Sequence, residues 1–483
     1  MKLRLILLCL LSSPSFAADY FVSPSGNDSS PGSKAQPWKT ISKANQVLQP
    51  GDTVYVGPGE YREKIEPARS GQSGKYITYS SYDGRPWITA PPGGVAVKLI
   101  DKSYIFILGF GIDGKGAYTK SNIDSFVQID GGGRHIIEDG DFRNARGWAG
   151  ISIENSNYNK LLNNRVDQVG AWLSNVSHEG AGDMITMHCA SHNLIEGNHL
   201  TRGGHTLIAN NGDYNVIRNN LFDQKWGEGI GYRAMELTAN ERFCSKTVGY
   251  SLVEENTFRN MLKAPVKDET TGFKVEGEGH IVRFNMIDTV AGPATICVIR
   301  PPIIMSCQNN RIYNNTFRNA KVMWELRDQG AGAAFDNILK NNQLINTGMP
   351  KMQGTNKSVN NLTGDAFVDR GVPLTATTTD GDGTTVAVQD ARWFTDGFGI
   401  VAGDRIRVGA NPPATITATN YGANTLTFDK PLKWGKGDTV TLPYSGQSPD
   451  LGEGALAELT ETVPNPSGKP AIPTGLGLMR TAR

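Results

Sequence analysis

The chain lacks several features that would define other classes of protein. Its 48 basic and 47 acidic residues leave a formal charge of +1, without the basic excess that is typical of nucleic-acid-binding proteins. It has five cysteines and no Cys-x-x-Cys pair, so cysteine spacing predicts no zinc site. After the N-terminal segment, no apolar run is long enough to span a membrane. We therefore expect neither a nucleic-acid partner nor a membrane span, and the sequence leaves the oligomeric state open.

What the chain has instead is a repeat of an apolar residue, two residues, asparagine, one residue and a second apolar residue. The repeat is seen at Leu161–Asn164–Val166, Ile195–Asn198–Leu200, Ile217–Asn220–Phe222, Val253–Asn256–Phe258, Val282–Asn285–Ile287, Ile312–Asn315–Phe317 and Leu339–Asn342–Leu344. A second asparagine often stands two positions before the first apolar residue, at Asn159, Asn193, Asn215, Asn310 and Asn337. Such repeats are typical of a solenoid, whose coils bury their apolar faces by stacking.

This pattern, with short strands and turns rich in glycine and asparagine, predicts an all-β fold built around a right-handed parallel β-helix. The apolar residues of the repeat should lie inside. The asparagines should lie at bends, where they tolerate a left-handed backbone and can bond to the asparagine of the next coil.

The chain divides into four predicted segments. Residues 1–17 resemble a secretory signal, with a basic start, an apolar run and a small-residue cleavage pattern, which predicts a secreted or periplasmic protein. Residues 18–365 should form the β-helix with an N-terminal cap, in which residues 40–48 form a short helix. Residues 366–446 should form a small antiparallel β module, and residues 447–483 a tail rich in proline and glycine.

Four cysteines remain after the signal segment, and an oxidising compartment permits disulfide bonds. Cys297 and Cys307 flank a short insert that contains proline, and they are the best candidate pair. Buried free thiols are the alternative.

Strand alternation predicts which side chains face outward. Glu154, His188 and Asn210 each stand ten positions before a repeat asparagine and alternate with apolar neighbours, so they should form a solvent-facing column. In later coils, alternation adds Glu236, Lys274, Glu276, Arg300, Glu325 and Arg327. This mixture suits β-elimination on a uronic-acid polymer, which needs a neutralised substrate carboxylate, a base and an acid.

Candidate roles follow from these positions. Asn210, Glu236 and Glu276 are candidate oxygen ligands of Ca²⁺. Lys274 is a candidate base, because the like charge of Arg300 would lower its pKa, and Arg300 would neutralise charge or donate a proton.

Other residues are candidates on weaker grounds. His188 and His205 are candidate catalytic groups, with turn or stacking roles as the alternative. Arg233 and Tyr232 stand near Glu236, and the guanidinium of Arg233 suits a sugar carboxylate. The remaining candidates for substrate binding are Trp226 and Arg327.

The cap segment Thr40–Ile65, with Pro50–Val56 and Gly59–Tyr61, resembles a known superfamily when taken with the asparagine repeats. Over residues 20–350 the chain is similar to pectate-lyase-like right-handed parallel β-helix proteins. The closest similarity is to secreted polysaccharide lyases of the alginate lyase and chondroitinase B type.

This resemblance implies Ca²⁺ held by an asparagine on one coil and glutamates on the next, with lysine as base and arginine as acid. The order Asn210, Glu236, Lys274, Arg300 is similar. The chain departs from the family in lacking its Glu-x-Glu followed shortly by lysine, and Lys246 is the other candidate for that lysine.

The predicted function is therefore a lyase for an acidic polysaccharide, with alternatives on the same fold. Glycoside hydrolysis needs clustered carboxylates, and Asp183, Glu236 and Glu276 are available. A C5-epimerase shares the proton abstraction. A non-catalytic carbohydrate-binding or surface β-helix would have a groove with aromatic residues and no dependence on ions.

Overall fold

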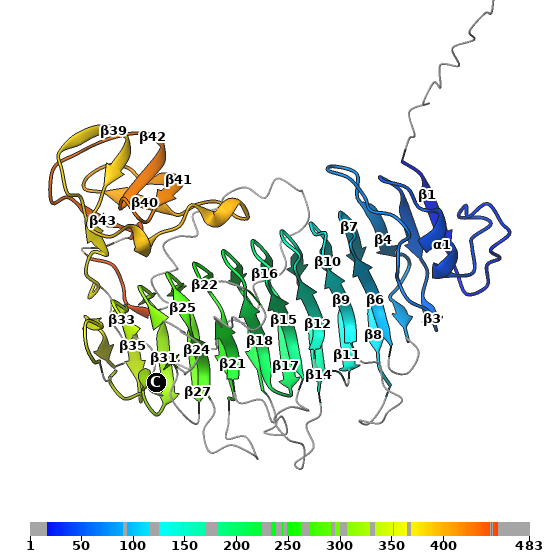
Figure 1. Cartoon of the computed structure of the whole chain (residues 1–483), viewed down its shortest axis with the longest axis horizontal. Coiled ribbons are helices and arrows are strands. Elements are labelled where there is room, and N and C mark those ends of the chain that lie inside the picture. The colour runs from blue at the N-terminus through cyan, green and yellow to red at the C-terminus, as the bar shows by residue number, and fades with distance from the viewer. Residues whose placement is uncertain are drawn as a thin grey trace, which may run out of the picture.

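Long parallel sheets that run side by side form most of the molecule (Figure 1). The computed structural model describes residues 17–89, 94–115, 125–145, 147, 149–170, 182–224, 233–237, 244, 249–261, 271–290, 295–299, 307–328, 334–350, 352–364, 369–444, 446 and 448–452. The predicted parallel β-helix is confirmed, because successive coils pair strand on strand in parallel along the molecule. The segment predicted as a signal, apart from Ala17, and the tail after residue 452 lie outside the described residues.

Three sheets make the walls of the β-helix. The 13-stranded sheet consists of β1 (Asp19–Val22), β2 (Thr53–Val56), β4 (Ile77–Ser81), β7 (Ile105–Leu108), β10 (Ile136–Glu138), β13 (Lys160–Leu162), β16 (Leu194–Glu196), β19 (Val216–Arg218), β22 (Leu252–Glu254), β26 (Ile281–Arg283), β30 (Arg311–Tyr313), β34 (Ile338–Lys340) and β36 (Lys357–Val359).

The 12-stranded sheet consists of β3 (Gly59–Tyr61), β5 (Pro86–Ile88), β8 (Gly111–Asp113), β11 (Asp141–Ala145), β14 (Arg165–Val169), β17 (His199–Gly203), β20 (Leu221–Asp223), β23 (Thr257–Arg259), β27 (Met286–Val290), β31 (Thr316–Ala320), β35 (Gln343–Ile345) and β37 (Leu362–Thr363).

The nine-stranded sheet consists of β6 (Val95–Ile100), β9 (Ser125–Asp130), β12 (Ala149–Glu154), β15 (Asp183–His188), β18 (Thr206–Asn211), β21 (Arg233–Leu237), β24 (Thr271–Val275), β28 (Thr295–Ile299) and β32 (Trp324–Asp328). A small sheet of β25 (Gly277–Glu278), β29 (Cys307–Gln308) and β33 (Ala334–Phe335) lies among the later coils.

The repeat asparagines stack into a ladder at the bend between the 13-stranded and 12-stranded sheets. Asn164 is buried between β13 and β14, and its side-chain amide donates to the Ile137 carbonyl of the preceding coil at 2.9 Å. Its backbone amide and Nδ2 both donate to Oδ1 of Asn198 in the next coil, at 2.9 and 3.0 Å. The same pattern continues through Asn220, Asn256, Asn285, Asn315, Asn342 and Asn361. The predicted bond between asparagines of successive coils is thus confirmed.

The ladder asparagines do not have the left-handed backbone that the sequence predicts. The residue before each of them takes the positive φ instead, for example Asn163 at 54°, Asn219 at 54° and even Phe284 at 55°. The ladder amide must point inward to reach its neighbours, so the tight turn falls on the preceding residue.

The N-terminal cap contains the predicted helix, α1 (Ile41–Val47), beside β1 (Figure 1). Thr40 is its N-cap, and the Thr40 hydroxyl accepts a hydrogen bond from the Lys43 amide at 3.0 Å. Ile41 and Ala44 are fully buried in the main apolar core, so the helix closes this end of the β-helix. Across the ranges described above, no helix is long and apolar enough to cross a membrane.

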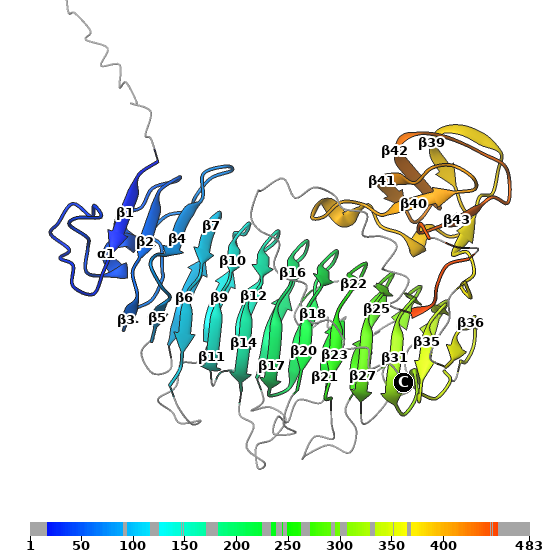
Figure 2. The ribbon, with the colours of Figure 1, turned by 180° about the vertical axis from the view of Figure 1, so that it is seen from behind.

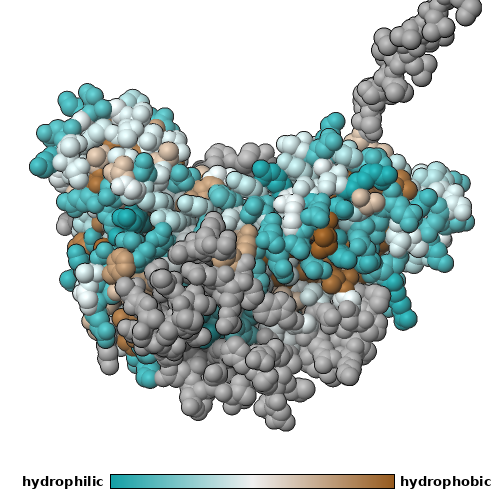
Figure 3. All heavy atoms as spheres, in the orientation of Figure 1, coloured by the Kyte–Doolittle hydropathy of each residue, from teal (hydrophilic) through white to brown (hydrophobic). Residues whose placement is uncertain are grey.

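The predicted antiparallel β module is also confirmed. Its sheet contains β38 (Thr375–Ala376), β39 (Gly381–Ala387), β40 (Arg405–Val408), β41 (Ala414–Asn420), β42 (Thr425–Trp434) and β43 (Thr439–Thr441), with the 3₁₀ turns η2 (Ala391–Trp393) and η3 (Gly397–Gly399). Figures 1 and 2 show the module against the later coils of the 13-stranded sheet. The described surface drawn in Figure 3 is mostly hydrophilic, with small separate apolar patches.

A buried ion pair fixes the module to the β-helix. Arg283 of β26 donates to Glu254 of β22 at 2.7 Å and to Asp404, just before β40 of the module, at 2.6 Å. Tyr313 accepts from Arg283 at 2.9 Å and donates to the Trp393 carbonyl at 2.6 Å. An apolar cluster that contains residues of both parts surrounds these contacts. The module and the β-helix therefore share one interface core.

A disulfide joins Cys189, just after β15, to Cys244, with 5.3 Å between their Cα atoms. Cysteine spacing does not predict this pair, because 55 residues separate the two cysteines and only the stacking of coils brings them together. Cys307 is disulfide-bonded as well. Its pairing with Cys297 stays a prediction, because the Cys297 side chain lies outside the description.

We expect the asparagine ladder to make a large contribution to stability. In Asn285→Ala, the Asn256 amide loses its acceptor at 3.0 Å and the Val253 carbonyl loses a donor at 3.0 Å, both in a buried site. The free energy of unfolding should fall by about 3 kcal/mol, which a lower thermal unfolding midpoint would show. Gln353→Ala removes an exposed amide and should leave the free energy of unfolding within about 0.5 kcal/mol of the wild-type value. A wild-type midpoint for Asn285→Ala would contradict this account of the ladder.

The ion pair at the module interface should be equally sensitive. Arg283→Met leaves the carboxylates of Glu254 and Asp404 buried without their cation, and we expect about 4 kcal/mol of destabilisation in chemical unfolding. Arg405→Met changes an exposed arginine of the same module and serves as the control. Equal stability of the two variants would show that Arg283 does not hold the module in place.

Candidate functional site

The outward face of the nine-stranded sheet carries one continuous column of aligned residues. Strand register places the following residues side by side from coil to coil: Lys98, Gln128, Ser152, Thr186, Ala209, Glu236 and Lys274. The neighbouring column contains Met235 and Phe273, which are fully buried in the core. Glu236 and Lys274 thus lie on the outward side, as strand alternation predicts.

Charged side chains gather where this column crosses β21 and β24. We call Asp183, His205, Arg233, Glu236, Lys274 and Glu276 the charged cluster. Glu236 is its centre, because it contacts Arg233 and lies 3.9 Å from Nζ of Lys274. Burial alone would raise the pKa of Glu236, but the charges of Lys274 and Arg233 hold that pKa well below its usual range. Glu236 is therefore an ionised carboxylate over the whole physiological pH range.

Lys274 lies between two carboxylates. Its Nζ is 2.6 Å from Oε1 of Glu276 and 3.9 Å from Oε2 of Glu236, and all three residues are buried. These ion pairs are made by the ammonium form of Lys274. The like-charged neighbour that the sequence prediction required, Arg300, lies outside the described residues.

His280, which is buried in the core, holds the backbone of Glu276 in position. It belongs to a second row of stacked side chains, formed two positions before the first apolar residue of each repeat and mostly by asparagines, where its Nδ1 accepts from the Ser251 amide at 3.1 Å. Its Nε2 donates to the Glu276 carbonyl at 2.9 Å. Burial lowers the pKa of His280 to about 4, so the ring is neutral and can make both bonds. His280 thus links the stacking of coils to the charged cluster.

A histidine–aspartate pair forms the other side of the cluster. Nδ1 of His205 is 2.8 Å from Oδ1 of Asp183, which also accepts from the Thr206 amide at 3.0 Å. Burial alone would lower the pKa of His205, but the hydrogen bond and charge of Asp183, with the charge of Glu236, raise it. Burial raises the pKa of Asp183, against the lowering effect of His205. The hydrogen bond to Asp183 therefore fixes the orientation of the His205 ring.

The prediction that Asn210 faces outward is wrong. Asn210 is in register with Met187 and Leu237, which are buried in the core. Its Nδ2 donates to Ser251 at 2.9 Å, and its Oδ1 accepts from Asn215 at 2.8 Å. The fixed count of ten residues fails here because the bend after β18 is one residue shorter. His188 is in register with Asn211, so Asn211 holds the predicted outward position.

The predicted calcium ligands do not form a cation site in this structure. Asn210 points into the core, and the carboxylates of Glu236 and Glu276 are already paired with Arg233 and Lys274. In the part of the chain that the structure describes, no group of three histidine, cysteine, aspartate or glutamate side chains is arranged to hold a metal ion. These donors do not fit Ca²⁺, and we assign no chemical step to it.

The remaining predicted residues lie apart from the cluster or outside the description. His188, in β15, is two strands from Glu236 in the sheet, and burial lowers its pKa. Arg327 lies in β32, but its side chain is not described. The residues Arg300, Lys246, Trp226 and Tyr232 lie outside the described residues.

Comparison with known proteins agrees with this fold. Residues 20–169 match the family model described as "Pel9A-like, right handed beta helix region". This part of the chain is similar to a Pel9A-like right-handed β-helix region. The match confirms the resemblance to the pectate-lyase-like superfamily.

Individual relatives are distant. The uncharacterized protein YwoF of Bacillus subtilis (strain 168) is 29% identical over 136 residues, which are 26% of this chain and 29% of that protein. The structure of XylC with xylose has a TM-score of 0.49 at 12% identity and covers 87% of this chain and 99% of its own. Pectate lyase Pel9A has a TM-score of 0.46 at 15% identity and covers 91% of this chain and 96% of its own.

The raised pKa of His205 predicts a specific pH dependence of stability. Protonated His205 stabilises the fold below the unfolded-state pKa of about 6.5, and this stabilisation is lost as the pH rises through the higher folded-state pKa. The wild-type protein should therefore lose stability as the pH rises from the unfolded-state pKa to the folded-state pKa of His205, whereas His205→Gln should not. Urea unfolding midpoints measured across the interval test this. His199→Gln, which removes a histidine whose pKa burial lowers, should keep the wild-type loss. An unchanged pH profile in His205→Gln would contradict the assignment.

Proposed function

We propose that this protein is a polysaccharide lyase that cleaves an acidic, uronic-acid-containing polysaccharide by β-elimination at the charged cluster. One observation carries the proposal: two cations from adjacent strands, Arg233 of β21 and Lys274 of β24, flank one carboxylate whose charge also interacts with an oriented histidine, His205, just before β18. The match of residues 20–169 to a Pel9A-like β-helix region supports the fold on which this chemistry is proposed.

The cations supply what a uronate substrate needs first. β-Elimination removes the proton next to the sugar carboxylate, and that proton becomes acidic enough only when the carboxylate charge is neutralised. The guanidinium of Arg233 can bind a carboxylate through two parallel hydrogen bonds, and the ammonium of Lys274 adds a second positive charge. Glu236 and Glu276 hold both cations in place before substrate arrives.

Two groups then move protons. Neutral His205 takes the C5 proton of the uronate as the bond between C4 and the glycosidic oxygen breaks and the C4–C5 double bond forms. The Lys274 ammonium gives a proton to the leaving oxygen. A base whose pKa lies near the working pH is the most efficient one, and the raised pKa of His205 suits this role. The earlier expectation of Lys274 as base remains the alternative assignment.

Hydrolysis of a glycosidic bond is the second candidate, on a separate observation. Burial raises the pKa of Asp183, whereas the pKa of Glu236 is held well below its usual range. Two carboxyl groups whose pKa values are shifted in opposite directions can serve as acid and base of a glycoside hydrolase.

Secretion or a periplasmic location is part of the proposal. Disulfides form and persist in oxidising compartments, so the bond between Cys189 and Cys244 supports this location. Calcium stays a prediction from the sequence, and because Asn210, Glu236 and Glu276 do not fit it, no step of the proposed mechanism depends on it.

The test is an absorbance assay for unsaturated uronate product. Purified protein would be incubated with alginate, polygalacturonate, chondroitin, heparin-type and bacterial acidic polysaccharides, each with calcium and with chelator. We expect product from at least one polymer, and Lys274→Met and His205→Ala should each lower kcat at least about 100-fold. Lys357→Met, at an exposed lysine of the 13-stranded sheet, should retain wild-type kcat.

The other outcomes are equally informative. New reducing ends without unsaturated product would replace the lyase with a hydrolase. Full activity in both variants would remove the cluster from the mechanism. Because both residues are buried, circular dichroism and unfolding midpoints must show that the variants are folded.

A further inference from the structure

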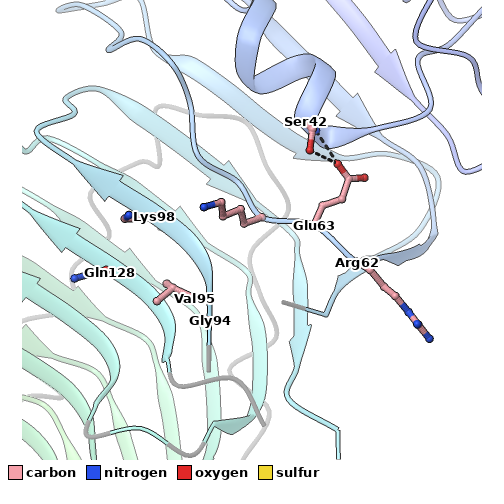
Figure 4. A pocket seen from close by; sticks show the side chains of 8 residues that line it. Ser42, Arg62, Glu63, Gly94, Val95, Lys98 and Gln128 are labelled. Atoms are coloured by element: carbon pink, nitrogen blue, oxygen red, sulfur yellow. Dashed lines mark hydrogen bonds between the residues drawn. The ribbon is translucent and has the colours of Figure 1, made fainter. Parts of the chain in front are cut away.

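We propose a second acidic-sugar site on this face, in a pocket between the N-terminal cap and strand β6. The proposal rests on the proposed function and deepens it, because it assigns a distant binding site for the same polymer. The pocket has a volume of about 450 Å³ and is lined by residues of the cap, β6 and β9, among them Ser42, Glu63, Lys64, Lys98 and Gln128. Figure 4 shows Lys98 and Gln128 on neighbouring strands, with Ser42 and Glu63 on the opposite side.

The one carboxylate in the lining is already satisfied by the start of helix α1. Oε2 of Glu63 accepts from the Ser42 amide at 2.8 Å and from the Ser42 hydroxyl at 2.6 Å, and its Oε1 accepts from the Ile41 amide at 3.3 Å. Figure 4 shows the two bonds to Ser42. Glu63 therefore repels an incoming carboxylate less than a free glutamate would.

The remaining charges in the pocket are positive. Lys64 and Lys98 share a single carboxylate, Glu66, at 2.6 and 3.6 Å. Arg62 adds a third cation at the rim, where it points away from Lys98 (Figure 4). Both lysines are exposed, at 47% and 39% of their side chains, so a ligand can reach them. With the amide of Gln128 as a further hydrogen-bond donor or acceptor, the pocket suits a sugar that carries a carboxylate and hydroxyls.

The register of the sheet connects this pocket to the charged cluster. Lys98 and Gln128 begin the same outward column that reaches Glu236 and Lys274 further along the sheet. Five strand steps separate β6 from β21 in the sheet, which at ~4.8 Å per step places the two sites on the order of 24 Å apart. A polymer that lies along the β-helix can reach both sites, whereas a short oligosaccharide reaches only one of them.

The test compares the affinities of a long and a short ligand. Polygalacturonate and alginate, and their trimers, would be the probes, in the His205→Ala background, whose lower kcat limits cleavage of the chains during the measurement. Lys64→Gln/Lys98→Gln should lower the ratio of polymer affinity to trimer affinity roughly ten-fold, because two favourable charges are lost. Lys357→Gln is the matched control and should leave that ratio unchanged. A neutral β-glucan should bind none of these proteins measurably.

The result separates this site from the proposed function. If the folded double variant keeps the wild-type ratio of polymer affinity to trimer affinity, the pocket is not a binding site for the polymer, even where the lyase assay gives product. A lowered ratio would support the pocket, even where no polymer yields unsaturated product and the lyase proposal fails. Equal binding of the neutral β-glucan would overturn the carboxylate specificity. Unfolding midpoints of the double variant would show that its fold is intact.

Discussion

The structure depends on one constraint, the exact stacking of each coil on the one before it. A buried asparagine can meet its neighbours only if the next coil places another amide at the same bend, and the ladder from Asn164 to Asn361 does this without interruption. Parallel register in all three long sheets follows from this stacking. The same register brings Glu236 beside Lys274, although 38 residues separate them in the chain. The site is thus a product of the repeat, although none of its charged residues belongs to the repeat.

The charged cluster has the properties of a site that is organised before its ligand arrives. Its cations are held by internal carboxylates, and its histidine is oriented by Asp183. His280 ties the Glu276 backbone to the second row of stacked side chains, so a group of the core controls the position of a charge in the cluster. Burying several charges costs stability, and the cost is recovered only where each charge has a partner. Buried charges in such numbers on neighbouring coils are more typical of a functional site than of a structural surface.

Local patterns in the sequence predicted much of the fold. The apolar spacing of Ile41 and Ala44 predicted helix α1, the repeat predicted the β-helix, and alternation predicted the strands of the module, because each of these features depends on residues near one another in the chain. Local sequence patterns predicted less of the charged cluster. Alternation placed Glu236 and Lys274 outward, but a fixed count to the ladder failed at Asn210, since bends between sheets differ by a residue. The bond between Cys189 and Cys244 and the pair of His205 with Asp183 depend on how coils align, which no single segment encodes.

The parallel register determines the distance between the two proposed binding sites. Every coil adds one strand to the sheet, so the span between the N-terminal pocket and the charged cluster is a whole number of strand spacings. A gain or loss of one coil between β6 and β21 would lengthen or shorten that span by one unit and leave both ends unaltered. The number of coils between the two sites therefore sets the length of the shortest polymer that can contact both of them.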